Sequence, residues 1–205
     1  MSMDTSKKSA NNRSIDIQIC LQVIEIADLE KIYLWKNNFE LSSLIMSHPL
    51  PVSIHQLHEW FERNQADRNQ VLFGIYLLNN SQIVGIVRLM FIDWISSHAE
   101  LGIYIGEDKM RNQGIGKESM KLILQYAFKK LNLSRIYLRV LEGNNGVIRL
   151  YQSLGFAQEG ILRRHYWVNG KYENVLIFGI LRSEYLNVET MCNHAAHVFP
   201  LVWLL

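Results

Sequence analysis

The sequence predicts a single α/β domain of the α+β type, with about seven strands and about four helices in one layered fold. Segments with strand periodicity and segments with helical periodicity follow one another over residues 15–186, and turn residues separate them. No internal repeat or linker divides this range. The expected order is β-α-α-β-β-β-α-β-α-β-β. Residues 1–14 are expected to form a disordered leader and residues 187–205 a C-terminal tail.

The composition is that of an ordinary globular chain. It has 205 residues, of which 49% are hydrophobic, and 21 basic residues balance 19 acidic ones. This balance argues against nucleic acid as a partner. No apolar run reaches the ~20 residues that span a bilayer, so no membrane span is expected. The two cysteines, Cys20 and Cys192, do not form a disulfide framework, which favours a cytoplasmic location.

The first half is expected to begin with a strand and two helices. Apolar residues alternate over residues 15–21, which is the period of a strand. Asp28 is placed to cap the first helix, and Ser53 with Gln56 fits a capping box for the second. A loop with two prolines separates the helices. Their core faces are expected to carry Leu29, Ile32 and Trp35 in the first helix, and Leu57, Trp60 and Phe61 in the second.

The second half alternates strands and helices. Gly155 is suited to end a short helix, and Asn169-Gly170 is a strong type I′ hairpin signal. The expected strands are residues 70–78, 82–92, 98–105, 135–141, 156–168 and 171–181, and the expected helices are about 114–131 and 145–154.

A glycine-bearing loop, Arg111 to Gly116, joins a strand to an amphipathic helix. Gly114 and Gly116 permit close backbone approach, and the first amides of a helix have no intrahelical partners. The helix dipole is positive there, so the loop can hold a pyrophosphate. Arg111, Lys109 and Lys117 add positive charge. On this signal alone, an ordinary strand-to-helix turn is an equal alternative.

The context of the loop is more specific. R-N-Q-G-I-G follows H-A-E-L-G-I-Y-I, and R-I-Y-L-R-V-L-E-G-N-N and then V-I-R-L-Y-Q-S-L-G-F come after it. Over about residues 15–185, this series resembles the GCN5-related N-acetyltransferase (GNAT) superfamily. The part after Gly155 resembles the branch of ribosomal-protein alanine, spermidine and nucleotide-amino-sugar acetyltransferases. The resemblance implies a mixed, splayed sheet and acetyl-CoA as cosubstrate, without a metal.

The resemblance also implies where the cofactor binds. Pantetheine would pair with a strand backbone, and the pyrophosphate would lie on the loop amides. Asn112 stands where glycine is commoner in the family, so the loop is expected to be slightly stiffer. The residues implied are Ile103, Tyr104 and Ile105 for pantetheine, Arg111, Asn112, Gln113, Gly114, Ile115, Gly116 and Lys117 for phosphate, and Asn144 near the cofactor.

Two residues are candidates for the chemistry. Tyr151 matches the tyrosine with which resembling enzymes protonate the departing sulfur; the alternative is a packed aromatic whose hydroxyl bonds to the backbone. Glu100 shares a strand face with Gly102 and Tyr104, and is a candidate base or acceptor-binding carboxylate. The alternative for Glu100 is a salt bridge to Arg88 or Arg139 on a neighbouring strand.

The acceptor is expected to be an amine. W-K-N-N (35–38), M-S-H-P (46–49) and H-E-W-F (58–61) resemble elements of enzymes that acetylate nucleotide-linked 4-amino sugars, and residues 39–53 hold no acidic cluster for a polyamine. A nucleotide-linked 4-amino sugar is therefore the first expectation. A protein N-terminus, spermidine or another small amine is an alternative acceptor, and a non-catalytic acetyl-CoA-binding module is an alternative function. A homodimer is possible.

The histidines and cysteines do not predict a metal site. His55 and His58 lie one helical turn apart, and Cys192, His194 and His197 cluster near the end of the chain. Neither set has the number and spacing of ligands that a complete site needs.

Overall fold

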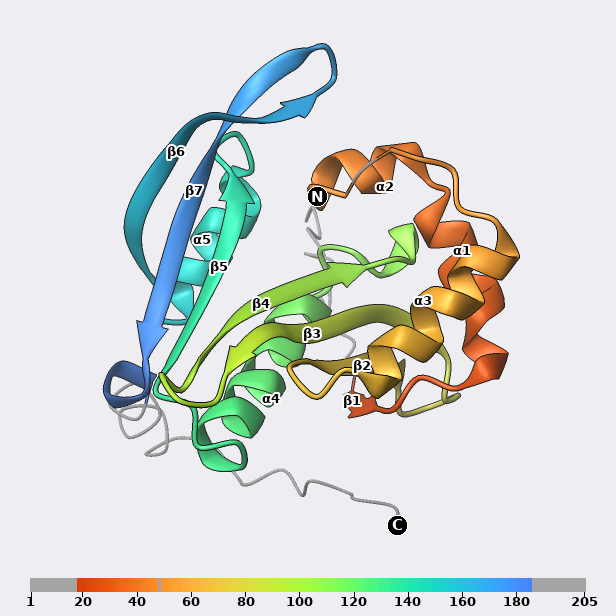
Figure 1. Cartoon of the computed structure of the whole chain (residues 1–205), viewed down its shortest axis with the longest axis horizontal. Coiled ribbons are helices and arrows are strands. Elements are labelled where there is room, and N and C mark those ends of the chain that lie inside the picture. The colour runs from red at the N-terminus through yellow and green to blue at the C-terminus, as the bar shows by residue number, and fades with distance from the viewer. Residues whose placement is uncertain (1–17, 48, 186–205) are drawn as a thin grey trace, which may run out of the picture.

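The computed structural model describes residues 18–47 and 49–185, which form one seven-stranded sheet with helices on both faces (Figure 1). The strand order is β1-β2-β3-β4-β5-β7-β6. The strands are β1 (Ile19–Gln22), β2 (Val71–Leu77), β3 (Ile83–Asp93), β4 (His98–Ile105), β5 (Arg135–Leu141), β6 (Ala157–Val168) and β7 (Lys171–Leu181). The helices are α1 (Leu29–Lys36), α2 (Phe39–Leu44), α3 (Ile54–Ala66), α4 (Ile115–Lys129) and α5 (Asn145–Ser153), with 3-10 turns η1 (Ile26–Asp28) and η2 (Asp108–Met110).

The sheet is splayed between β4 and β5. These two strands are the parallel pair of an otherwise antiparallel sheet. Their pairing begins at His98 with Arg135 and ends at Glu100 with Tyr137. Beyond that point β4 continues to Ile105 and β5 to Leu141 without pairing, and Figure 1 shows the two strands diverging. The splayed α/β fold expected from the sequence is confirmed.

Two apolar clusters cover the two faces of the sheet. Ile115, Met120, Ile123 and Leu124 of α4 pack with Leu101 on one face. Helices α1 and α3 cover the other face of β2 to β4, where Trp35 meets the Tyr104 ring edge-on with centroids 6.2 Å apart. The predicted alternation of β4 is therefore correct, because Leu101 and Tyr104 belong to opposite clusters.

The main difference from the expected order lies before β2. The expected loop contains the additional helix α2, so the described part of the chain has five α-helices. Asn38 begins α2, and its side chain accepts a hydrogen bond from the amide of Leu41 at 3.0 Å. Asp28 does not cap α1 with its side chain; it accepts from the Glu25 amide and from the Tyr76 hydroxyl instead.

Other local expectations are confirmed. Ser53 and Gln56 form the reciprocal capping box at the start of α3, with bonds of 3.2 and 2.8 Å. Asn169 and Gly170 both have positive φ, as a type I′ turn requires. Gly155 follows α5 with φ 90°.

Among residues 18–47 and 49–185, no helix combines the length and apolar character needed to cross a membrane. The expected leader at 1–14 and tail at 187–205 lie outside the described residues.

Candidate active site

The opening between β4 and β5 leaves one edge of β4 free. Ile103, Tyr104 and Ile105 pair on one side with Val87, Ile86 and Gly85 of β3. On the side of β5, the pairing has already ended at Glu100. The backbone groups of Ile103 and Tyr104 that point toward β5 are therefore available to a ligand, whereas the Ile105 carbonyl accepts from Arg111. This is the edge on which the resemblance places pantetheine.

The loop after β4 has the backbone geometry of an anion cradle. Asn112 and Gly114 both lie in the left-handed region, with φ of 60° and 82°. Asparagine tolerates this conformation better than most residues, which explains how it occupies a position where glycine is commoner in the family. A Cβ added to Gly114 would meet nothing within 4 Å, so the space beside the loop is open.

The first amides of α4 are free to bind a ligand. Glu118 donates to the Gly114 carbonyl at 3.1 Å. The amides of residues 115–117 have no acceptor among the described residues. Lys117 is exposed and makes no ion pair within the described chain. These groups are suited to a pyrophosphate at the positive end of α4.

Arg111 and Gln113 are engaged within the loop. The Arg111 guanidinium donates to the carbonyls of Ile105 and Gly106 at 3.0 and 3.5 Å, and pairs with Asp108 at 2.7 Å. The Gln113 side chain donates to the Lys109 carbonyl. The Arg111 side chain therefore fixes the loop to the end of β4, and the Gln113 side chain fixes it to η2. Their direct contact with phosphate stays a prediction.

Tyr151 lies on α5 with 6% of its surface exposed. Its ring packs against Phe156 and Phe178, with centroids 5.9 and 6.2 Å away. The hydroxyl makes no hydrogen bond to the described residues, so the backbone-bonded alternative is not observed there. Burial raises the pKa of Tyr151 well above its ordinary value. The phenol is therefore protonated at neutral pH and has an uncommitted proton.

Asn144 acts as the N-cap of α5. Its side-chain oxygen accepts from the Val147 amide at 3.4 Å, and this bond begins the helix that carries Tyr151. Its expected proximity to the cofactor stays a prediction.

Glu100 is buried at the point where β4 and β5 separate. Its two carboxylate oxygens accept from the Arg139 guanidinium at 2.8 and 3.2 Å. Burial, and then the negative charge of Glu100, raise the pKa of the neighbouring Tyr137. Of the two arginines considered from the sequence, Arg139 is the one that binds Glu100. The structure therefore contains the expected salt bridge, and a role of Glu100 as base stays a prediction.

Two cations of the β4 face, Arg88 and Lys36, are not among the site residues predicted from the sequence. Arg88 is the register partner of Gly102, and its Nε would lie 3.3 Å from a Cβ added there. Lys36 lies with Nζ 4.2 Å from the centroid of the Trp60 ring. Burial first, and then the charge of Arg88, lower the pKa of Lys36 to about 8. The sequence signal that could have identified Arg88 as a site residue is its place as a basic residue inside the apolar run of β3.

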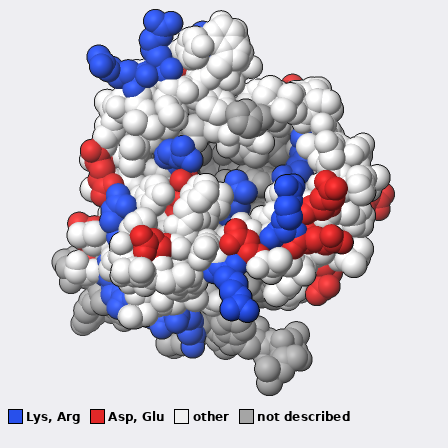
Figure 2. Space-filling model, in the orientation of Figure 1, with Lys and Arg blue, Asp and Glu red and all other residues white. Residues whose placement is uncertain are grey.

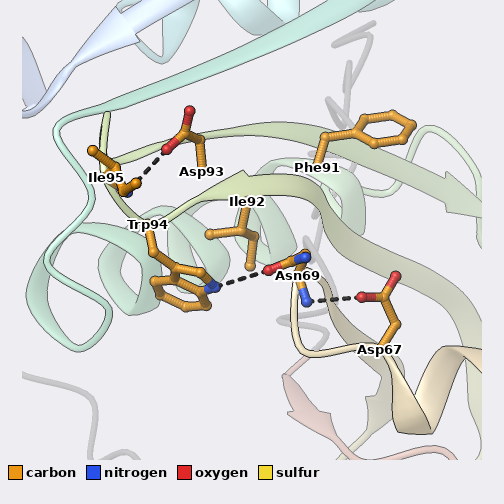
Figure 3. Close-up of a pocket in the computed structure, with 7 residues that line it drawn as sticks. All are labelled: Asp67, Asn69, Phe91, Ile92, Asp93, Trp94 and Ile95. Atoms are coloured by element: carbon orange, nitrogen blue, oxygen red, sulfur yellow. Dashed lines mark hydrogen bonds between the residues drawn. The ribbon is translucent and has the colours of Figure 1, made fainter.

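A separate hollow lies where α3 ends and β3 turns toward β4 (Figure 3). The Trp94 side chain donates a hydrogen bond to the Asn69 side chain at 3.1 Å, and the carboxylates of Asp67 and Asp93 accept hydrogen bonds from backbone amides. These polar groups are therefore engaged in local hydrogen bonds around a turn. The hollow contains none of the predicted site residues.

Metal ligands do not gather in the described part of the chain. Residues 18–47 and 49–185 contain no group of three or more His, Cys, Asp or Glu side chains arranged to hold an ion. Cys192, His194 and His197 lie outside the described residues.

Comparison with known proteins identifies the fold. Residues 18–157 match the family model of the acetyltransferase (GNAT) domain. The chain belongs to the GNAT acetyltransferase family. It is therefore an N-acetyltransferase by family, with acetyl-CoA as the cosubstrate that this family uses.

Similar members of this family have named acceptors. The chain is 31% identical to a spermidine N(1)-acetyltransferase of Vibrio cholerae serotype O1 over 83% of this chain and 96% of the relative. It is 24% identical to a putative ribosomal N-acetyltransferase, YdaF, of Bacillus subtilis over 83% of this chain and 95% of the relative. A crystal structure of the V. cholerae spermidine enzyme with CoA and spermine superposes with a TM-score of 0.78, at 31% identity, over 83% of this chain and 99% of that one.

Proposed function

We propose that this chain moves the acetyl group of acetyl-CoA directly onto a primary amine in the opening between β4 and β5. The observation that carries the proposal is the end of the β4–β5 pairing at Glu100 and Tyr137, because it frees a strand edge for pantetheine. The free amides at the start of α4 lie just after this strand, in a position suited to the pyrophosphate.

The reaction needs no covalent enzyme intermediate. A neutral amine nitrogen attacks the thioester carbon, and the tetrahedral intermediate collapses as the carbon–sulfur bond breaks. The amine loses its extra proton, and the CoA thiolate gains one. Tyr151 is the proposed donor to sulfur, because its hydroxyl is protonated and has no other partner among the described residues. Glu100 is the proposed acceptor-side carboxylate, held in place by Arg139.

Three acceptor classes are candidates. The spermidine acetyltransferases among the relatives support a polyamine, which the sequence ranks as an alternative. The nucleotide-linked 4-amino sugar, ranked first from the sequence, has no support from these relatives and depends on short motifs in the first half of the chain. A protein N-terminus has the support of the name of the B. subtilis relative. Homodimer formation and a cytoplasmic location stay predictions.

An acceptor panel tests the proposed function. The protein is mixed with acetyl-CoA, a thiol reagent and, in turn, spermidine, a nucleotide-linked 4-amino sugar and an alanine-ended peptide. Mass spectrometry then identifies the acetylated product. We expect CoA release that depends on one of these amines. Calorimetric binding of acetyl-CoA without CoA release for any amine would instead support the non-catalytic module.

A further inference from the structure

We infer that Lys36 and Arg88 form an anion-binding subsite in the acceptor pocket, which selects an amine that also carries a phosphate or carboxylate group. The substrate class rests on the proposed acetyltransferase function. The subsite itself can be tested by binding, without turnover.

The position of Arg88 places this subsite at the opening. Arg88 pairs in register with Gly102, two residues beyond Glu100 on β4. A Cβ on Gly102 would lie 3.3 Å from Nε and 3.5 Å from Cγ of Arg88. Because Gly102 has no side chain, the arginine lies across β4 on the face that carries Glu100 and Tyr104. The guanidinium is thus beside the place where β4 and β5 separate.

Arg88 is partly buried yet lacks an acceptor. Within the described chain, its guanidinium makes no hydrogen bond and no ion pair, although it has five N–H donors. Arg88 interacts electrostatically with the Glu100 carboxylate, but both oxygens of Glu100 accept hydrogen bonds from Arg139. Desolvated charge without a partner is unfavourable, so an incoming anion would complete this site.

Lys36 adds a second charge to the same space. Its ammonium lies over Trp60, and the preceding residue, Trp35, packs on Tyr104, which shares the face of β4 that Arg88 crosses. Burial first, and then the charge of Arg88, lower the pKa of Lys36. Lys36 makes no ion pair with a described residue. Two neighbouring cations repel each other, and an anion between them removes that repulsion. In Figure 2, Lys and Arg side chains border the hollow at the centre of the face.

This charge pattern separates two acceptor chemistries. A polyamine brings further positive charges next to Lys36 and Arg88, where the one neighbouring carboxylate identified, Glu100, is already paired. A phosphate or carboxylate would find a planar guanidinium for bidentate binding and an ammonium as a point charge. The pocket of this chain therefore favours an anionic amine over the spermidine that its relatives accept.

Binding of simple anions tests the subsite. The protein is first saturated with CoA, so that the loop at the start of α4 is filled. Pyrophosphate and succinate are then titrated by calorimetry as separate probes of phosphate and carboxylate. We expect at least one to bind, with about a tenfold loss of affinity in Arg88→Gln and in Lys36→Gln, as for loss of one charge-assisted contact. The exposed Arg68→Gln and Lys130→Gln are controls that remove the same charges elsewhere.

Kinetics then connect the subsite to the acceptor. In Arg88→Glu, KM for spermidine should fall and KM for an anionic amine should rise, while KM for acetyl-CoA stays unchanged. Arg88→Lys should retain most anion binding. If Arg88→Gln does not fold, Lys36→Gln, which changes α1 and not the sheet, decides the result. Equal anion affinity in the wild type and both Gln variants, or binding of neither probe by the wild type, overturns the inference. If no amine is acetylated but the anions still bind, only the proposed function is rejected.

Discussion

Both carboxylate oxygens of Glu100, the last paired residue of β4, accept hydrogen bonds from the guanidinium of Arg139, which lies on β5 just beyond its last paired residue, Tyr137. The pair thus bridges the strands at the point where the sheet opens. Since Glu100 is buried and Arg139 is partly exposed, the carboxylate is the partner that depends more on the bond. This geometry makes Glu100 a positioned group and limits its freedom to collect a proton.

We expect Glu100→Gln and Arg139→Gln each to lower the free energy of unfolding by about 1–3 kcal/mol, as for a buried group that loses its charged partner. In a double-mutant cycle, the two losses should be strongly non-additive, because either change breaks the same contact. Urea unfolding followed by circular dichroism measures the coupling. A purely additive pair would contradict the bridge.

Tyr151→Phe should lower kcat by about 10²-fold or more, the range for loss of a general acid, with little change in KM for acetyl-CoA. The melting temperature should stay near that of the wild type, because the hydroxyl has no hydrogen bond to lose among the described residues. Tyr172→Phe, at an exposed tyrosine on β7, is the matched control and should retain full activity. An unchanged kcat in Tyr151→Phe would remove this residue from the mechanism.

Gly114 and Gly170 provide a matched pair for the phosphate loop. Their φ values are 82° and 81°, and an added Cβ would meet nothing within 4 Å at either position. Gly114→Ala and Gly170→Ala should therefore cost similar stability, about 1–2 kcal/mol. Affinity for acetyl-CoA, measured by calorimetry, should fall in Gly114→Ala and remain normal in Gly170→Ala. Gly114→Val should abolish binding, and normal affinity in that variant would refute the phosphate cradle.

The pKa of Lys36 predicts a pH dependence. Burial and Arg88 lower it from 10.5 to about 8, so the unfolded chain binds this proton more tightly than the folded one. The Lys36 contribution to stability should therefore rise with pH from about 8 to 10.5. The difference in unfolding free energy between wild type and Lys36→Met should follow this rise. A difference that is flat over this window would contradict the lowered pKa.

The same titration should affect binding of the acceptor. As pH rises through about 8, Lys36 loses its charge and an anionic amine should bind less tightly. This trend is measured as acceptor KM against pH, and the rise should be absent in Lys36→Met. Tyr104 stays neutral near this pH, because burial raises its pKa.

Much of the fold could be predicted because its signals are local. The Ser53–Gln56 capping box, the Asn169-Gly170 turn and the alternation of β4 each depend on residues close in sequence. The helix α2 was missed because Asn38 caps a segment too short for a clear apolar period. Family motifs indicated the loop at the start of α4 and Tyr151.

By itself, the sequence determined most of the strand and helix pattern and the acetyltransferase family, because glycine positions, caps and motif order are written along the chain. Only the tertiary structure decided that Arg139 binds Glu100, and that Arg88 lies across Gly102 without an acidic partner among the described residues. It also placed Lys36 of α1 over Trp60 of α3. Strand register and helix docking set these contacts, and the spacing of the residues along the sequence carries no information about them.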